Sequence, residues 1–353
     1  MDLDYFTYNI PSHLIAQEPV QPKDHSRLMV LDRTGLSIKH RHFYDLLDIL
    51  DANDVLVINN TKVVPVRIMA KKSTGRLIEI LLIKQDSNNL SHWMALAKPL
   101  KKIKPGHEFT LVNDNDSWLI KVVDTFEYLD GYKRIIVDIG EAKLLYSRLN
   151  SFGYAPLPPY IAQDINTRRL SDITNYQTIF AKNIGAIAAP TAGMHFTGRL
   201  TDQLRQKNID ILEITLHVGV GTFKPITASK IENHVMESEE YTISKSTAAA
   251  LNQAKADKKR IIAVGTTTTR ALESACVNGS IEASSNATTQ LYIKPDYKFK
   301  FIDGLITNFH LSKSSLLVMV STFAGHELTK QAYESAIENN YRFYSYGDAM
   351  LIL

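Results

Sequence analysis

The sequence predicts an α/β protein in which an irregular, TIM-like α/β barrel carries an inserted antiparallel β-barrel domain. Two patterns lead to this fold class. Apolar segments that end in Thr, His or Asn alternate with amphipathic helical patterns, which is typical of βα units in a parallel sheet. After the first of these segments comes a stretch of short apolar runs separated by turn residues, which is typical of an antiparallel barrel.

Five segments follow the first pattern, because each is apolar along most of its length and polar at its end. In a barrel of parallel strands the active site lies at the C-terminal ends of the strands, so these polar ends predict a site on one face. The expected strands are 54–61, 185–191, 211–217, 260–266 and 304–310, and the expected helices are 197–207, 245–257, 269–275 and 314–323.

The second pattern occupies the stretch from residue 62 to residue 155. Turn signals such as Lys104-Pro105-Gly106 separate its short strands, a helix is expected over 141–150, and prolines from Pro156 onward make a stiff connection back. The expected strands are 64–69, 77–83, 92–97, 108–112, 117–123 and 134–139. We therefore expect a discontinuous catalytic domain, 1–61 with 156–353, and an inserted domain, 62–155.

Composition limits the class of protein. The 353 residues suffice for about two domains. A net charge of +3 neither requires nor excludes a nucleic-acid partner, because local patches matter more than the total. The single cysteine, Cys276, excludes an internal disulfide framework and a multi-cysteine metal site. No targeting segment or bilayer-length apolar stretch is recognisable, so we expect a cytoplasmic protein that does not contact membranes.

Common cofactor and metal motifs are absent from the sequence. Gly219-Val220-Gly221 lacks the third glycine of a dinucleotide-binding loop, and His326-Glu327 lacks the second histidine of a zinc-protease helix. His40 and His42 are spaced to face one way on a strand, but no third ligand accompanies them. We therefore expect no metal and interpret the two histidines as part of a half-exposed strand.

Two strand-end segments contain histidines suited to catalysis. Thr191 and His195 lie in a loop of small residues before a helix, where a backbone can approach a ligand closely. His217 leaves its strand and is followed by glycines, which makes it a candidate acid or base. A capped loop without a ligand and a packed histidine bonded to a carbonyl group remain the ordinary alternatives.

Two further strand ends have polar clusters suited to substrate binding. Four threonines beginning at Thr266 precede Arg270 at the start of a helix, and Asn308 and His310 lie at the end of the last expected strand. Hydroxyl groups at a helix start are also common caps, so this alternative stays open. The segment from His234 to Glu239 brings together ionisable groups whose pKa values burial could separate, or it is a solvated acidic helix start.

Clusters of lysine are the candidate contacts for nucleic acid. Such clusters neutralise phosphates and make binding depend on salt, although a run of charge is usually a solvated face. The candidates are Lys98, Lys101, Lys102 and Lys104 in one cluster and Lys71 and Lys72 in another.

Several long motifs together resemble one family, the S-adenosylmethionine:tRNA ribosyltransferase-isomerases of queuosine biosynthesis. The resemblance spans nearly the whole chain, and its motifs are long and specific. They are Asn59-Asn60-Thr61-Lys62-Val63, Pro190-Thr191-Ala192-Gly193-Met194-His195-Phe196-Thr197, Thr215-Leu216-His217-Val218-Gly219-Val220-Gly221-Thr222-Phe223 and Leu305-Ile306-Thr307-Asn308-Phe309-His310-Leu311, with shorter matches at 15–19, 26–28, 40–43 and 346–350.

The resemblance implies both a fold and a reaction. The fold is an α/β barrel with an inserted β-barrel, in agreement with the patterns above. The reaction moves the ribosyl part of S-adenosylmethionine onto 7-aminomethyl-7-deazaguanine (preQ1) at the wobble position of tRNA and rearranges it, giving epoxyqueuosine, adenine and methionine. S-adenosylmethionine is then a consumed co-substrate, no cofactor is expected, tRNA is the partner, and we expect a monomer.

Three departures from the family pattern affect the candidate residues. The family commonly has Asp and Arg where Asn60 and Lys62 stand, His where Glu237 stands, and Pro where Ser312 stands. Because Glu237 cannot be an obligatory histidine base, the catalytic candidates become His217, His195 and Glu239. Lys62 keeps the positive charge expected for substrate binding but lacks the bidentate fork of arginine.

The remaining roles are hypotheses drawn from position at the strand ends. We expect Thr191, Thr266 and Arg270 to hold the nucleoside and the methionine carboxylate, and Asn308 and His310 to read a base edge. A barrel aldolase or sugar-phosphate enzyme is an alternative, but neither a Schiff-base lysine nor a late phosphate loop is recognisable. A non-catalytic tRNA-binding module is another, although it would not need polar residues on so many strand ends.

Overall fold

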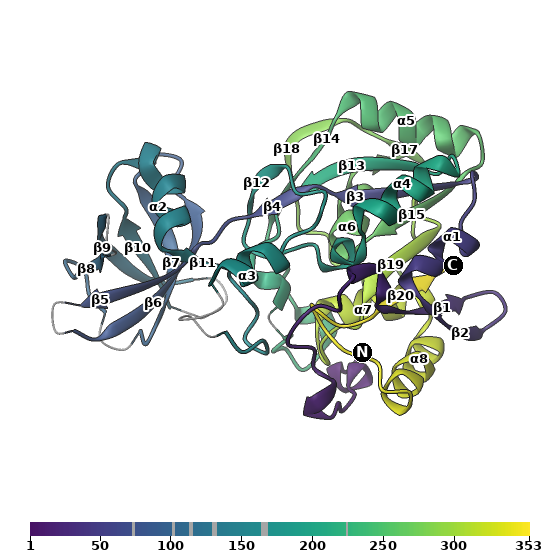
Figure 1. Ribbon diagram of the computed structural model, residues 1–353, viewed down its shortest axis with the longest axis horizontal. Helices are drawn as coiled ribbons and strands as arrows, with labels where there is room; N and C mark the ends of the chain where they lie inside the picture. Colours follow the sequence, from purple (N-terminus) through teal and green to yellow (C-terminus); the bar gives the residue numbers. More distant parts are fainter. Residues whose placement is uncertain (73–74, 101–102, 113–115, 129–132, 164–168, 224) are drawn as a thin grey trace. The chain divides into compact units, whose positions relative to one another are not determined.

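A computed structural model describes residues 1–72, 75–100, 103–112, 116–128, 133–163, 169–223 and 225–353 (Figure 1). The chain divides into two compact units. The larger unit comprises Met1–Lys62, Pro158–Ala162 and Asn175–Leu353, and the smaller unit comprises Val63–Leu157 and Gln163–Thr174. The division into domains 1–61 with 156–353 and 62–155 stays a prediction. Each helix in the described part of the chain is too short or too polar to traverse a bilayer.

The larger unit is built on a nine-stranded mixed sheet. Its four inner strands, β13, β3, β15 and β19, run parallel to one another. The flanking strands β14 and β20 run antiparallel to β13 and β19. In spatial order the strands are β18 (Ser284–Thr289), β14 (Glu239–Ile243), β13 (Asp210–Leu216), β3 (Asp54–Asn59), β15 (Arg260–Val264), β19 (Gly304–Asn308), β20 (Ala349–Ile352), β1 (Arg27–Asp32) and β2 (Ser37–His42).

The α/β class is confirmed, but the TIM-like barrel is not. In the described ranges no pairing joins the outer strands β18 and β2, and a TIM barrel would need a closed ring of parallel strands. The expected strand 185–191 is also wrong in its extent, because only Asn183–Ala186 (β12) is a strand, and it pairs with β4 (Thr61–Val63) in a separate small sheet. Pro190 cannot donate to a ladder, and the chain turns there into the short helix η6 (Thr191–His195).

Both faces of the sheet are buried, which explains the near-continuous apolar runs of the inner strands. Along β3, Val55 and Val57 pack into one apolar cluster, while Leu56 and Ile58 pack into another. Because successive side chains of a strand point to opposite faces, these two clusters lie on the two sides of the sheet. The inner strands are thereby fixed in register, and so are the polar residues at their ends.

Side-chain caps start several helices of the larger unit. Thr197 accepts a hydrogen bond from the amide of Leu200 at 3.2 Å, and Ser314 accepts one from the amide of Leu317 at 3.1 Å. The predicted helices are confirmed, although α6 begins three residues earlier than expected. The α-helices of this unit are α1 (Leu46–Ile49), α4 (Gly198–Gln206), α5 (Lys245–Ala256), α6 (Thr266–Ala275), α7 (Ser315–Ala324) and α8 (His326–Glu338), whereas α3 (Arg169–Asn175) belongs to the smaller unit up to Thr174.

The smaller unit contains a closed antiparallel barrel, as predicted. Pairing of β5 with β8 closes the ring, with Lys71 opposite Thr110. Trp118 is buried inside and donates from its indole nitrogen to the carbonyl oxygen of Ile139 at 2.9 Å. Around the ring lie β5 (Arg67–Lys72), β6 (Leu77–Gln85), β7 (His92–Lys98), β10 (Lys133–Asp138), β9 (Ser117–Glu127) and β8 (Glu108–Val112), with β11 (Gly153–Tyr154) beside β5 and helix α2 (Leu145–Phe152) following.

Candidate functional site

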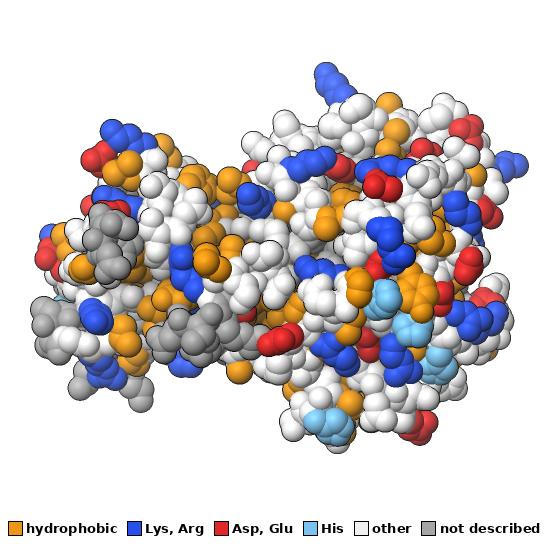
Figure 2. All heavy atoms as spheres, in the orientation of Figure 1, with side chains coloured by type: hydrophobic (Ala, Val, Ile, Leu, Met, Phe, Trp, Pro, Cys, Tyr) orange, Lys and Arg blue, Asp and Glu red, His pale blue; other side chains and the backbone are white. Residues whose placement is uncertain are grey.

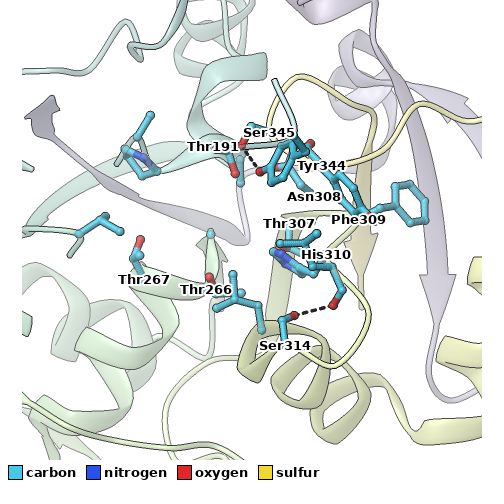
Figure 3. A pocket seen from close by; sticks show the side chains of 18 residues that line it. Thr191, Thr266, Thr267, Thr307, Asn308, Phe309, His310, Ser314, Tyr344 and Ser345 are labelled. Carbon is cyan, nitrogen blue, oxygen red and sulfur yellow. Dashed lines mark hydrogen bonds between the residues drawn. The ribbon is translucent and has the colours of Figure 1, made fainter. Parts of the chain in front are cut away.

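A pocket in the larger unit lies at the C-terminal ends of β15 and β19 (Figure 3). It holds about 580 Å³ of space, including part that is open to solvent. Four residues predicted to bind substrate line it together: Thr191, Thr266, Asn308 and His310. The other lining residues are Tyr160, Ala189, Pro190, Ala192, Val218, Gly265, Thr267, Thr307, Phe309, Leu311, Ser314, Leu316, Tyr344 and Ser345.

The first turn of α6 contributes the hydroxyl groups of Thr266 and Thr267 to this pocket. Gly265 makes the sharp transition from β15 into α6 with a φ of 94°, a conformation that residues other than glycine rarely adopt. The next hydroxyl, that of Thr268, bonds back to the carbonyl oxygen of Val264 at 2.8 Å and is therefore structural. Only part of the threonine run faces the pocket.

Asn59, at the end of β3, ties three strand ends together. Its Nδ2 donates to the carbonyl oxygen of Leu216 at 2.9 Å and to Oγ1 of Thr267 at 3.3 Å. Its Oδ1 accepts from the amides of Leu216 at 3.0 Å and Thr61 at 3.1 Å. A single buried amide thus joins β3 to the end of β13, to β4 and to the start of α6.

His310, which follows β19, is held in a neutral state by burial. Burial lowers the pKa of its imidazole to about 3. Its Nε2 lies 2.7 Å from Oγ1 of Thr307, its backbone amide donates to the hydroxyl of Tyr333 at 2.8 Å, and its carbonyl oxygen accepts from the hydroxyl of Tyr8. His310 therefore presents an uncharged, fully positioned side chain to the pocket.

His195 lies directly behind the pocket. Its Nε2 is 3.2 Å from Nδ2 of Asn308, and its Nδ1 is 2.7 Å from Oγ of Ser26. The ring stacks on Phe43 with the ring centres 5.0 Å apart. Burial, assisted by the positive charge of nearby Lys23 and Arg342, lowers the pKa of His195 to about 3. The site thus contains a second neutral histidine.

His217 is half-buried, and the pocket lining given above does not include it. Its Nδ1 lies 2.8 Å from Oγ1 of Thr61. Gly185 faces the ring so closely that a Cβ atom there would lie 2.7 Å from ring atoms of His217. Burial lowers the pKa of His217, while the negative charge of Glu240 opposes this shift.

Glu239 and Arg270 form a buried ion pair instead of projecting separately into the pocket. The guanidinium contacts the Glu239 carboxylate through Nη1 and donates through Nε to the carbonyl oxygen of Leu291 at 2.9 Å. The other carboxylate oxygen accepts from the amide of Gly219 at 3.0 Å, next to the lining residue Val218. The pair braces the segment after β13 against α6. Residues 234–238 are neither helix nor strand, and Glu239 begins β14, so the acidic helix start considered above is not formed.

The predicted cationic contacts lie on the surface. Lys62 is exposed on β4. In the smaller unit, Lys71 and Lys98 point outward from β5 and β7, and Lys104 is exposed in the loop after β7. Lys101, Lys102 and the side chain of Lys72 lie outside the described residues. Figure 2 shows Lys and Arg side chains interspersed with Asp and Glu across the visible face, in keeping with the small net charge.

Sequence reasoning missed the pocket residues that come from outside the βα units. Tyr160 and Ser345 line the pocket and hydrogen-bond to each other at 2.7 Å, and Tyr344 lies beside them (Figure 3). The only local signal is the family motif that begins at Tyr346. Within the ranges that the structure describes, no cluster of three or more His, Cys, Asp or Glu side chains suits a metal ion.

Comparison with known proteins gives matches over the whole chain. Residues 3–352 match the family described as queuosine biosynthesis protein. A relative from Staphylococcus haemolyticus (strain JCSC1435), S-adenosylmethionine:tRNA ribosyltransferase-isomerase, is 43% identical over 354 residues, and the match covers 100% of each chain. The crystal structure of S-adenosylmethionine tRNA ribosyltransferase from Thermotoga maritima has a TM-score of 0.55 and 34% identity, covering 99% of this chain and 100% of that one.

The Glu239–Arg270 pair generates a prediction about stability. Arg270→Ala and Glu239→Ala should each lower the free energy of unfolding by about 3 kcal/mol, because each leaves a buried charge without its counter-charge. Urea denaturation measures this loss, and the double variant should lose less than the sum of the two single variants. Arg205→Ala, which breaks an exposed pair with Asp202, is the matched control and should change stability by less than about 1 kcal/mol. Additive losses at 239 and 270 would contradict the role of the pair.

Proposed function

Since the chain belongs to the queuosine biosynthesis family of S-adenosylmethionine:tRNA ribosyltransferase-isomerases, we propose that it transfers and isomerises the ribosyl moiety of S-adenosylmethionine onto tRNA. The acceptor is 7-aminomethyl-7-deazaguanine (preQ1) at the wobble position, and the product is epoxyqueuosine-tRNA, with release of adenine and methionine. S-adenosylmethionine is consumed, so the reaction needs no further cofactor. The enzyme acts as a cytoplasmic monomer on tRNA.

The observation that carries this proposal is that polar residues from the ends of β15 and β19 and from η6 line one pocket. Thr191, Thr266 and the pair Asn308 and His310 come from three segments far apart in sequence, and all of them except Thr266 belong to the family motifs. A mixed polar and apolar lining of this kind suits a nucleoside, whose flat base is apolar on its faces and polar at its edge. A non-catalytic tRNA-binding module would not require such a pocket.

The proposed chemistry needs proton transfers at separate places. The sulfonium of S-adenosylmethionine acidifies the neighbouring 5′ carbon of the ribose, so that a base can remove a proton there. Adenine leaves after it gains a proton or hydrogen bonds at a ring nitrogen. The unprotonated amine of the tRNA base forms a carbon–nitrogen bond to the ribosyl group and gives up a proton. The bond between the 5′ carbon and sulfur breaks, and methionine leaves with the electron pair of that bond. Two groups with different pKa values are therefore required.

We assign the groups by their positions in the fold. His217 is the proposed proton-transfer group, and the Glu239–Arg270 pair holds the segment that follows it. Thr191 and Thr266 bind the nucleoside, while His310 contacts a base edge as a neutral side chain. Lys62 offers a cation for an anionic part of the substrate, and the lysines of the smaller unit contact tRNA phosphates.

The direct test is incubation of the enzyme with S-adenosylmethionine and tRNA that carries preQ1. We expect release of free adenine, one per modified tRNA, together with the mass gain of epoxyqueuosine in the digested nucleosides. Liquid chromatography with mass spectrometry measures both products. Unmodified guanine at the wobble position is the matched control and should give neither product. Binding of both substrates without release of adenine would refute the proposed reaction.

The role of His217 has its own test. His217→Ala should lower kcat by about 100-fold or more, the usual contribution of a general acid or base. Because burial lowers the pKa of His217, its neutral form persists to lower pH than that of an ordinary histidine. The acid limb of the kcat profile should therefore lie below pH 6.5, the usual pKa of histidine, and should disappear in the variant.

His13→Ala, at an exposed histidine of the larger unit, is the control for this substitution and should leave kcat and its pH profile unchanged. A loss below tenfold in His217→Ala would remove His217 from the proton transfers.

The lysines of the smaller unit are tested through the salt dependence of tRNA binding. Replacing Lys71, Lys98 and Lys104 by Gln should weaken binding and reduce the slope of log K against log salt by about 2, because three phosphate contacts are lost. Filter binding or fluorescence anisotropy over a range of KCl concentrations measures the slope. Gln at Lys121 and Lys143, which already pair with Glu108 and Glu141, is the control. An unchanged slope in the triple variant would exclude these lysines from the tRNA contact.

A further inference from the structure

Asn308 presents an unsatisfied acceptor at the pocket. The residue is only 2% exposed, and it belongs to the lining of the pocket. Its Nδ2 donates to the carbonyl oxygen of Tyr344 at 3.2 Å and lies 3.2 Å from Nε2 of His195. Its Oδ1 is buried and has no hydrogen-bond partner among the described residues. A buried carbonyl oxygen without a donor is costly, so this atom points to a ligand.

The neighbours fix which amide atom is nitrogen. The carbonyl oxygen of Tyr344 can only accept a hydrogen bond, so the amide atom beside it must be Nδ2. Nδ2 has a second hydrogen, and His195 Nε2 is the acceptor in reach. Nε2 must then be unprotonated, which places the ring proton of neutral His195 on Nδ1, facing Oγ of Ser26. The chain of contacts thus sets both the tautomer of His195 and the orientation of the amide.

The surroundings of His195 keep its ring neutral, so that the hydrogen bonds to Asn308 and Ser26 do not change with pH near neutrality. The ring is buried against Phe43, and the charged groups that face it, Lys23 and Arg342, both oppose a positive charge on the imidazole. Together with burial they hold its pKa at about 3. A histidine that stays neutral and has both ring nitrogens engaged is poorly placed to exchange protons with a substrate.

We propose that His195 is a positioning residue that holds the Asn308 amide so that Oδ1 accepts an N–H group of bound S-adenosylmethionine. This replaces the catalytic role that the sequence predicts for His195, and it rests on the proposed function. S-adenosylmethionine has two kinds of N–H donor, the exocyclic amine of adenine and the ammonium group of methionine. Asn308 then distinguishes ligands with a donor at this place from those without one.

The first experiment observes the unaltered protein. NMR of the histidine ring nitrogens, assigned with His195→Gln, should show His195 as the Nδ1–H tautomer, without titration between about pH 5 and 8. A ring that carries its proton on Nε2, or that titrates in this range, would overturn the proposal. This result does not depend on enzymatic activity, so it is separate from the test of the proposed function.

The second experiment compares three variants. In His195→Gln the side-chain oxygen can replace Nε2 as an acceptor, but the residue cannot transfer a proton, whereas His195→Ala removes the acceptor. We expect the KM for S-adenosylmethionine to rise about tenfold in His195→Ala and in Asn308→Ala, the cost of about one neutral hydrogen bond, and to return to within about threefold of the normal value in His195→Gln. The pH profile of kcat should be the same in all active variants.

The outcomes separate the possible failures. If His195→Gln loses kcat as completely as His195→Ala and one limb of the pH profile disappears, His195 transfers protons and the positioning role is wrong. If Asn308→Ala binds S-adenosylmethionine with unchanged affinity in calorimetry, Oδ1 is not the acceptor. His25→Gln, at an exposed histidine, is the matched control. If the unaltered enzyme itself releases no adenine, the proposed function fails instead.

A ligand analogue identifies the donor. For the S-adenosylmethionine analogue that has hydrogen in place of the exocyclic amine, Asn308→Ala should cause no further loss of affinity if the adenine amine is the donor. An equal loss with the analogue and with S-adenosylmethionine assigns the donor to the methionine ammonium group.

Discussion

The buried amide of Asn59 is the contact on which the geometry of the larger unit depends. It ends the central strand β3 and bonds to the backbone of Leu216 on β13 and to the hydroxyl of Thr267 on α6. Parallel strands that end in a buried region leave backbone groups without partners, and each such group needs a donor or acceptor. Asn59 supplies both at the point where the chain leaves the sheet for the smaller unit. The pocket beside it therefore has a rigid wall made of strand ends.

Burial of the sheet determines how much of the fold can be predicted from sequence. The inner strands and their helices can be predicted from sequence because both faces of the sheet around these strands are buried, which produces continuous apolar runs with polar ends. Whether the sheet closes into a barrel cannot be predicted from sequence, because closure depends on which edge strands pair. The edge strand β2 in particular has a sequence as polar as that of a loop. The strands β1 and β20 come from opposite ends of the chain, and the sheet extends beyond β19 only because β20 pairs with β19 and β1 pairs with β20.

The candidate site was predictable in part for a similar reason. Thr266 and Asn308 lie at the ends of β15 and β19, and His310 follows two residues after Asn308, so their convergence follows from the sheet. Thr191 joins them from η6, which the sheet alone does not predict. The partnership of Glu239 with Arg270 does not, because it joins a strand and a helix 31 residues apart through side-chain geometry. Tyr344 and Ser345 also escape prediction, since they enter the pocket from a loop before the last strand and not from the end of a parallel one.

The pocket is lined by uncharged side chains. Among the residues that line it in the described part of the chain there is no Asp, Glu, Lys or Arg, and both nearby histidines are neutral because burial lowers their pKa values to about 3. Under the proposed reaction the ligand is a sulfonium cation, which a protonated histidine would repel strongly in a region of low dielectric constant. Threonine hydroxyls and an amide oxygen instead offer fixed dipoles whose negative ends can face the sulfonium. These groups are already held in place by the protein, so binding the cation does not require a charged side chain to lose its hydration. Neutral histidines are thus a condition for binding this substrate, and the burial that removes their charge also holds them in place.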